Sequence, residues 1–310
     1  MTFGTGARRG GPAAFAVRLA RAEQLLAGPA GRGGAAAPLA LAASVLRLQA
    51  TRAAAPPVVV AAGAAAAGHE LRNAAGHFPL LDLAATIPAI AAEVPLGVTA
   101  LAPPGASGGE RSRGTGAAGV PDPLLAAGRA LAGGGDAERS ALVESWLEDP
   151  SAPEPVLGFW VRVAAGPILE TARAAVPTPG RDDWIGAACP ACGGLAQLSV
   201  IAEESGEFMG GSPRSLVCGR CAGWWTFPRA LCTWCSEADP GKLPSFVPDE
   251  RRAVRIDGCE TCGHYVKTFD LRDPGAAELV PLVDDVATVS LDLWARDQGL
   301  TRPLVSFAGV

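Results

Sequence analysis

The sequence has few charged and few aromatic side chains, and its first 188 residues contain no cysteine. Charged residues make up 18% and aromatic residues 5% of the 310 positions, whereas hydrophobic residues make up 49%. This much apolar material excludes a wholly disordered chain. All eight cysteines fall between Cys189 and Cys262, and this placement divides the chain into two parts.

The sequence also lacks an excess of positive charge, especially in residues 181–310, which contain the cysteines. Residues 1–180 carry a net charge of +1, and residues 181–310 carry −6. A protein that binds DNA or RNA draws most of its affinity from basic side chains on phosphates. We therefore expect no nucleic-acid partner.

No export signal or membrane span can be recognised. Arg8 and Arg9 could begin an export signal, but Arg18, Arg21 and Glu23 interrupt the stretch that follows, so no apolar signal segment develops. The uncharged stretch 53–68 has 16 residues and contains two prolines, whereas a span needs about 20 apolar residues. We predict a cytoplasmic protein without a membrane span, in which paired cysteines act as metal ligands or redox groups rather than as disulfides.

Residues 1–176 are predicted to form an α-helical domain. Apolar residues recur at helical spacing in two early segments, and Gly28 and Pro29 end the first of them. Asp122 and Asp136 are expected to be N-caps of later helices. Residues 156–174 form a longer apolar segment, which Pro167 should kink. A Gly/Pro-rich stretch over residues 102–121 is expected to be a disordered loop, and residues 177–183 a linker.

The cysteines form four CxxC pairs separated by 25, 10 and 23 residues. Two such pairs supply the four thiolates of a tetrahedral metal site. Four pairs that use every cysteine strongly indicate two metal sites. The pairs are Cys189 with Cys192, Cys218 with Cys221, Cys232 with Cys235, and Cys259 with Cys262.

The spacing favours a sequential arrangement, in which the first two pairs hold one metal ion and the last two pairs the other. The long gaps suit β-hairpins like those of zinc ribbons and rubredoxin, and an aromatic strand follows each second pair. The predicted fold is α+β and multidomain: two tandem rubredoxin-like four-cysteine modules, residues 184–228 and 229–272, follow the helical domain. A C-terminal helix over residues 276–300 should pack back on the domains. A cross-braced arrangement is the alternative.

Thiolate ligands do not distinguish iron from zinc. Four cysteines leave no coordination position for water, so a hydrolytic centre is not expected and no catalytic residue is assigned. The aromatic and basic residues near the pairs could fill the core or contact a partner. The candidate partner contacts are Trp224, Trp225, Arg229, Tyr265 and Lys267.

The cysteine pairs and the residues between them resemble the FdhE family of formate dehydrogenase accessory proteins. The resemblance is carried by Cys218-x2-Cys221-x3-Trp225-x3-Arg229-x2-Cys232-x2-Cys235 and by Cys259-x2-Cys262-Gly263-x-Tyr265-x-Lys267, with Asp284-Asp285 and Leu291-Asp292 further on. It covers roughly residues 185–302 and is weaker before them. It implies a helical domain followed by two rubredoxin-like modules, with iron as the metal.

The resemblance also implies a function. It predicts a non-enzymatic accessory factor for a respiratory formate dehydrogenase, which binds the catalytic subunit in the cytoplasm before that subunit is exported. An iron-thiolate electron-transfer protein and a zinc-ribbon interaction module are the alternatives. The sequence leaves open whether the chain forms a homodimer.

Overall fold

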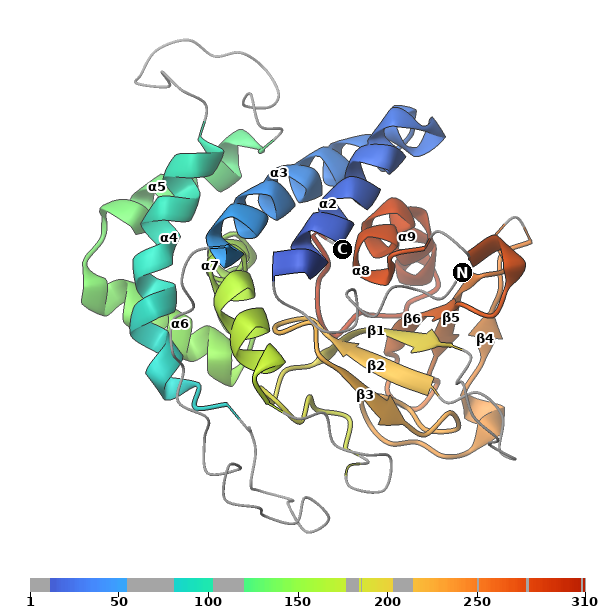
Figure 1. The fold of residues 1–310 in the computed structure, drawn as a ribbon. Coiled ribbons are helices and arrows are strands. Elements are labelled where there is room, and N and C mark those ends of the chain that lie inside the picture. Colours follow the sequence, from blue (N-terminus) through green and yellow to red (C-terminus); the bar gives the residue numbers. More distant parts are fainter. Residues whose placement is uncertain are drawn as a thin grey trace.

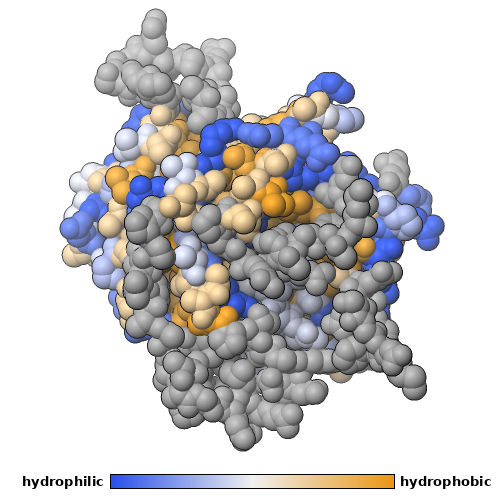
Figure 2. Space-filling view, in the orientation of Figure 1, coloured by the Kyte–Doolittle hydropathy of each residue, from blue (hydrophilic) through white to orange (hydrophobic). Residues whose placement is uncertain are grey.

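The computed structural model places a group of helices beside a six-stranded sheet, with two further helices between them (Figure 1). On the face in view, hydrophobic side chains gather over the middle and hydrophilic ones around the margins (Figure 2). The structure describes residues 12–54, 81–102, 120–176, 184, 186–202, 214–249, 251–276, 279–307 and 309. The loop expected over residues 102–121 lies almost entirely outside these residues, as does the linker expected over 177–183.

The first part of the chain is helical, as predicted. Short 3-10 helices precede or follow some of the main helices. The α-helices are α2 (Pro12–Ala27), α3 (Ala36–Ala53), α4 (Ile87–Leu101), α5 (Asp122–Gly133), α6 (Asp136–Glu148) and α7 (Pro155–Ala174).

The predicted N-caps of α5 and α6 are wrong by one position. The N-cap residues are Pro121 and Gly135, and no side chain caps either helix. Asp122 and Asp136 lie in the first turn instead, where a carboxylate favours the positive end of the helix dipole. The carboxylate of Asp136 is engaged by Arg139, three residues along the same helix, and is therefore not available as a cap.

A buried glutamine compensates for the proline inside α7. Pro167 has no amide hydrogen, so the carbonyl of Val163, four residues earlier, loses its helical partner. Gln49 of α3 donates its side-chain Nε2 to that carbonyl at 3.0 Å. Gly166 makes this approach possible, because a Cβ there would lie 2.4 Å from the Gln49 nitrogen. The helix therefore continues past Pro167 to Ala174.

The helix α4 packs inside the helical part. Together with the preceding turn, Ala84–Leu101, it is long and apolar enough to cross a membrane by length and composition alone. Its side chains Ile90, Val94 and Val98 are buried in the main hydrophobic cluster, which also includes Trp160 of α7. One face of the segment thus packs on the hydrophobic core, and 39% of it is buried.

The two cysteine modules share one sheet. Each contributes three antiparallel strands, and β1 and β6 join them as a parallel pair that aligns Ser199 with Thr268. This pairing covers two strand edges that separate modules would leave open. In the order of the sheet, the strands are β3 (Trp224–Phe227), β2 (Arg214–Cys218), β1 (Ala196–Ile201), β6 (Tyr265–Asp270), β5 (Val254–Gly258) and β4 (Ser245–Phe246).

The C-terminal helical segment consists of two helices rather than one. These are α8 (Pro281–Ala287) and α9 (Val289–Asp297), and Thr288 lies between them. Val283 and Val286 of α8 pack in the same cluster as residues of α2 and α3. Leu291 of α9 packs against the strands. The segment thus contacts both the helical part and the sheet.

Candidate metal centres

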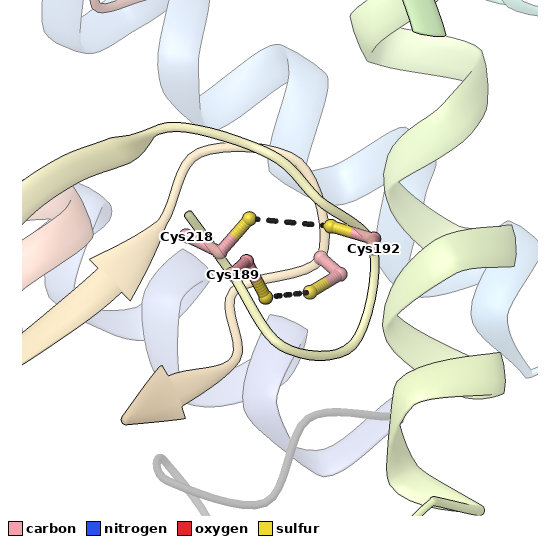
Figure 3. Close-up of side chains that lie close together, drawn as sticks. Cys189, Cys192 and Cys218 are labelled. Carbon is pink, nitrogen blue, oxygen red and sulfur yellow. Dashed lines mark hydrogen bonds between the residues drawn. The ribbon is translucent and has the colours of Figure 1, made fainter. Parts of the chain in front are cut away.

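The eight cysteines form two clusters of four, in the sequential arrangement predicted from their spacing. Site 1 contains Cys189, Cys192, Cys218 and Cys221, and site 2 contains Cys232, Cys235, Cys259 and Cys262. Within each cluster all sulfur atoms lie within 4.8 Å of one another. Figure 3 shows the sulfurs of site 1 turned toward a common centre. The cross-braced alternative does not occur.

The distances between sulfur atoms suit a tetrahedral metal ion. In site 1 the closest pairs are Cys189 with Cys221 at 3.6 Å and Cys192 with Cys218 at 3.4 Å. In site 2 both closest pairs are 3.7 Å apart. Four thiolates at about 2.3 Å from one ion would lie about 3.8 Å apart, whereas a disulfide requires about 2.05 Å. The donor set therefore fits Zn²⁺ or iron, and it does not distinguish between them.

All four CxxC pairs have the same backbone hydrogen bonds. The first cysteine of each pair accepts a bond at its carbonyl from the amide four residues on, at 2.8–3.2 Å. Its own amide donates to the carbonyl five residues on, at 2.8–2.9 Å. In two pairs an amide also points at a sulfur, from Arg220 to Cys218 at 3.3 Å and from Trp234 to Cys232 at 3.4 Å. These turns orient both sulfurs of each pair toward the centre of their site.

The same turn requires a left-handed backbone directly after each second cysteine. The four residues there have φ between 51° and 69°: Gly193, Ala222, Ser236 and Gly263. Glycine adopts this conformation without strain, whereas alanine and serine do so at a cost. This backbone conformation was not predicted from the sequence, although the glycine that follows two of the four pairs, Gly193 and Gly263, is a visible signal.

Site 1 is buried against the helical part of the chain. Its four cysteines are at most 1% exposed. The Arg220 side chain, inside the second pair, donates to the carbonyl of Trp146 in α6 at 2.8 Å, and its guanidinium stacks over the Trp146 ring. The amide of Leu81 donates to the carbonyl of Ala191, inside the first pair. Site 1 is therefore part of the contact between the sheet and the helices.

Site 2 reaches the surface. Cys235 is exposed and Cys262 is half-buried. Trp234, inside the first pair of this site, is 46% exposed and stacks on His264, with 4.8 Å between ring centroids. The two sites therefore share their turn geometry but differ in access to solvent.

Burial opposes charge on these thiols. It raises the pKa of Cys189 well above its usual range and raises the pKa of Cys262 to about 12. In Cys218 and Cys259 burial acts in the same direction, but hydrogen bonds from neighbouring groups outweigh it and lower the pKa. A bound cation would offset this cost, because metal ligation requires the thiolate form. Occupancy of either site is thus coupled to the release of protons.

Most of the predicted partner contacts are not accessible. Trp225, Tyr265 and Lys267 are buried, so they act as core residues and cannot reach a partner in this structure. Trp224 is half-buried and packs against the cluster beneath α8 and α9. Arg229 is exposed. Partner contact stays a prediction for Trp224 and Arg229.

Tyr265 and Lys267 belong to a buried charged network between the sheet and the terminal helices. The Lys267 ammonium lies 2.6 Å from Asp292 and 3.0 Å from Asp285. The guanidinium of Arg302 lies 2.8 Å from Asp285 and 3.0 Å from Asp292. The Tyr265 hydroxyl donates to Asp292 at 2.9 Å. Two basic and two acidic groups balance in charge. The network fixes α8, α9 and the residues after them on the sheet.

Comparison with known proteins connects these features to one family. Residues 231–307 match the family model described as FdhE, C-terminal domain. The Protein FdhE homolog of Aquifex aeolicus is 32% identical over 169 residues, which cover 54% of this chain and 57% of that protein. Protein FdhE of Escherichia coli O9:H4 is 29% identical over 120 residues, 38% of this chain and 36% of that protein. These alignments thus span about half or less of the curated relatives.

One solved structure resembles nearly the whole chain. The crystal structure of the FdhE protein from Pseudomonas aeruginosa matches with a TM-score of 0.69 and covers 97% of this chain and 98% of that one. The two sequences are 20% identical, so this match establishes the fold. The predicted order of a helical part, two four-cysteine clusters and a C-terminal helical segment is confirmed, and so is the resemblance stated from the sequence.

Proposed function

We propose that the chain is an accessory protein for a respiratory formate dehydrogenase, because residues 231–307 match the C-terminal domain of the FdhE family. It acts as a binding protein and not as an enzyme. It meets the catalytic subunit in the cytoplasm, before that subunit is exported. The observation that carries this proposal is the match to the family over site 2 and the terminal helices.

The metal-bound protein is the active form in this proposal. The four cysteines of each site supply thiolate ligands to one metal ion, and that ion stabilises the surrounding turns. Site 1 then holds the sheet against the helices, because its cysteines are buried there. Site 2 shapes the exposed surface around it.

Exposed apolar side chains of the site 2 module and of α9 are candidate contacts for a partner, and we call them together the aromatic surface. It comprises Trp234, Phe246, Val247, Leu293 and Trp294, which are 37–49% exposed. The rings of Phe246 and Trp294 are in edge contact, with 5.0 Å between centroids. Exposed aromatic side chains are enriched at the centres of protein interfaces. The catalytic subunit is the occupant we propose, in keeping with the family.

A binding experiment tests the proposal. The metal-loaded full chain is titrated against the immobilised catalytic subunit of a formate dehydrogenase from the same organism. We expect saturable binding that Trp234→Ala weakens at least tenfold. Leu96→Ser is the matched control, because Leu96 is a similarly exposed apolar residue on α4. An intact chain with two metal ions that does not bind the subunit contradicts the proposed function.

A further inference from the structure

Each metal site has a buried arginine beside it that forms no ion pair with a described residue. These residues are Arg220 at site 1 and Arg214 at site 2, and each is 5% exposed. In both side chains Nε is buried and has no hydrogen-bond partner. Leaving a buried cation unpaired is costly, and so is leaving a buried donor unsatisfied. Both arginines therefore need a negative charge nearby.

Arg214 shares a cavity with the sulfur ligands of site 2. It lies on the wall of a space of about 230 Å³ that Cys232 and Cys259 also line. Its Nη1 makes only long contacts, 3.4 Å to the carbonyls of Arg229 and Leu231. These neutral acceptors do not balance the charge of its guanidinium.

The one carboxylate among the described lining residues, Asp257, is engaged by other groups. One of its oxygens accepts from Nε of Arg255 at 2.9 Å, and the other from the Thr268 hydroxyl at 2.5 Å. Burial lowers the pKa of Arg214, and the negative charges of Asp257 and Cys232 oppose that shift. The thiolates of site 2 are thus the negative groups on this wall that are left for Arg214.

Arg220 has the same relation to site 1. A Cβ placed on Gly194 would lie 2.9 Å from Cδ of Arg220 and 3.0 Å from Sγ of Cys218, so the arginine side chain and the sulfur are neighbours. The guanidinium donates to the carbonyl of Trp146, which is again a neutral acceptor. Asp149 lies near enough to feel the charge of Arg220, but it is exposed, where water screens the attraction.

We propose that Arg214 and Arg220 each balance part of the charge of the metal–thiolate centre beside them and so raise the affinity of that centre for its metal ion. Four thiolates around a divalent ion carry two excess negative charges. Burying this charge is costly without a neighbouring cation, and the attraction is strong where water is excluded. The arginines are not ligands; they act through the sulfurs. The proposal concerns metal binding by the chain itself and does not depend on the proposed function.

Competition with a chelator tests the proposal on the full chain loaded with Zn²⁺. Cys235→Ser, at the exposed ligand of site 2, shows which step of metal loss belongs to that site. Arg214→Gln keeps a hydrogen-bond donor and loses the charge, so we expect at least tenfold weaker binding at site 2 and unchanged binding at site 1. Arg220→Gln should do the reverse. Parent-like affinity at the neighbouring site in these variants overturns the proposal.

Two further variants separate charge from local packing. Arg214→Lys keeps the positive charge, and we expect its site 2 affinity within threefold of that of the parent. Equal losses in Arg214→Lys and Arg214→Gln would overturn the proposal. Arg139→Gln is the matched control, because Arg139 is also buried with Nε unpaired but has Asp136 as its partner. Both affinities should stay unchanged in it.

The iron-loaded chain gives a readout that packing alone would not move. Iron with four thiolates carries one excess negative charge when ferric and two when ferrous, so a neighbouring cation favours the ferrous form. Arg214→Gln should therefore lower the reduction potential of site 2 and leave that of site 1 unchanged. A site 2 potential equal to the parent's or above it overturns the proposal. If one neutral variant does not fold, the other decides, because each arginine acts on its own site.

Discussion

The buried charged network gives a quantitative prediction for Lys267→Met. Lys267 is fully buried and contacts Asp285 and Asp292, and it also donates to the carbonyl of Asp285 at 2.9 Å and to the hydroxyl of Thr288 at 3.1 Å. Methionine is similar in length and has no charge. After the substitution, Arg302 alone faces two buried carboxylates, which leaves one negative charge unbalanced.

Removal of one partner from a buried ion pair typically costs about 3–5 kcal/mol. With a urea slope of about 2–3 kcal/mol per molar, this loss lowers the unfolding midpoint by about 1–2.5 M. Lys242→Met is the matched control, because the chain has two lysines and the Lys242 side chain is 51% exposed beside Glu237. An exposed ion pair contributes about 0–1 kcal/mol, so the control should shift the midpoint little.

The assay is urea unfolding of metal-loaded protein, followed by circular dichroism with metal content checked at each step. The double variant Lys267→Met with Asp292→Leu restores the charge balance, and we expect it to be more stable than Lys267→Met alone. A Lys267→Met midpoint within error of the Lys242→Met midpoint would refute the reasoning. If Lys267→Met does not fold at all, recovery of folding in the double variant still tests it.

Four further predictions concern the metal sites and the core. A chelator should remove the metal ion of site 2 quickly, because Cys235 is exposed, and that of site 1 slowly, because its cysteines are buried. Release of both ions in a single phase would contradict this difference. Gly263→Ala should lower the free energy of unfolding by about 1–2 kcal/mol, because its φ is 69°; a Cβ would meet no atom there, so the backbone conformation alone causes the loss. Ser236→Gly should raise the free energy of unfolding, because it removes a side chain from the same conformation. If both variants were as stable as the parent, backbone strain would not explain the turn. Gln49→Leu should cost about 1–3 kcal/mol in thermal unfolding by leaving the Val163 carbonyl unpaired, and an unchanged melting temperature would show that the contact is dispensable. Burial opposes the charge of Asp285, but Arg302 and Lys267 outweigh it and hold its pKa at about 2, below the usual 3.9. The stabilisation by this carboxylate is therefore complete above about pH 5 and is lost in acid unfolding as the pH falls toward 2; stability that is flat over that range would contradict this assignment.

The grouping of the cysteines could be predicted because it depends on spacing along the chain. A two-residue spacer brings both sulfurs of a pair to one ion, and gaps of 25 and 23 residues are long enough for a hairpin between pairs. Helices could be predicted for a similar reason, since apolar periodicity and the Gly28-Pro29 stop are local. The N-caps predicted at Asp122 and Asp136 were wrong by one residue, because the choice between cap and first turn depends on contacts such as that of Asp136 with Arg139.

The joining of the two modules could not be predicted from the sequence. The pairing of β1 with β6 links residues about 70 positions apart, and nothing in either strand's pattern specifies its neighbour. The difference in solvent exposure between the two sites could not be predicted from the sequence either. It depends on α6 and on Leu81, which are distant in sequence and contact site 1 through Trp146 and Ala191.

Several residues of the family motif are buried and stabilise the fold, so the partner surface should be sought elsewhere. Tyr265, Lys267, Asp285 and Asp292 lie in one buried network, so a substitution there would impair any function by loosening the terminal helices. Loss of activity in such variants would therefore not identify a contact. The aromatic surface offers a cleaner test, because Trp234 and its neighbours are exposed and their truncation removes little from the core. A variant there that keeps both metal ions and full stability, yet loses the partner, would locate the interface.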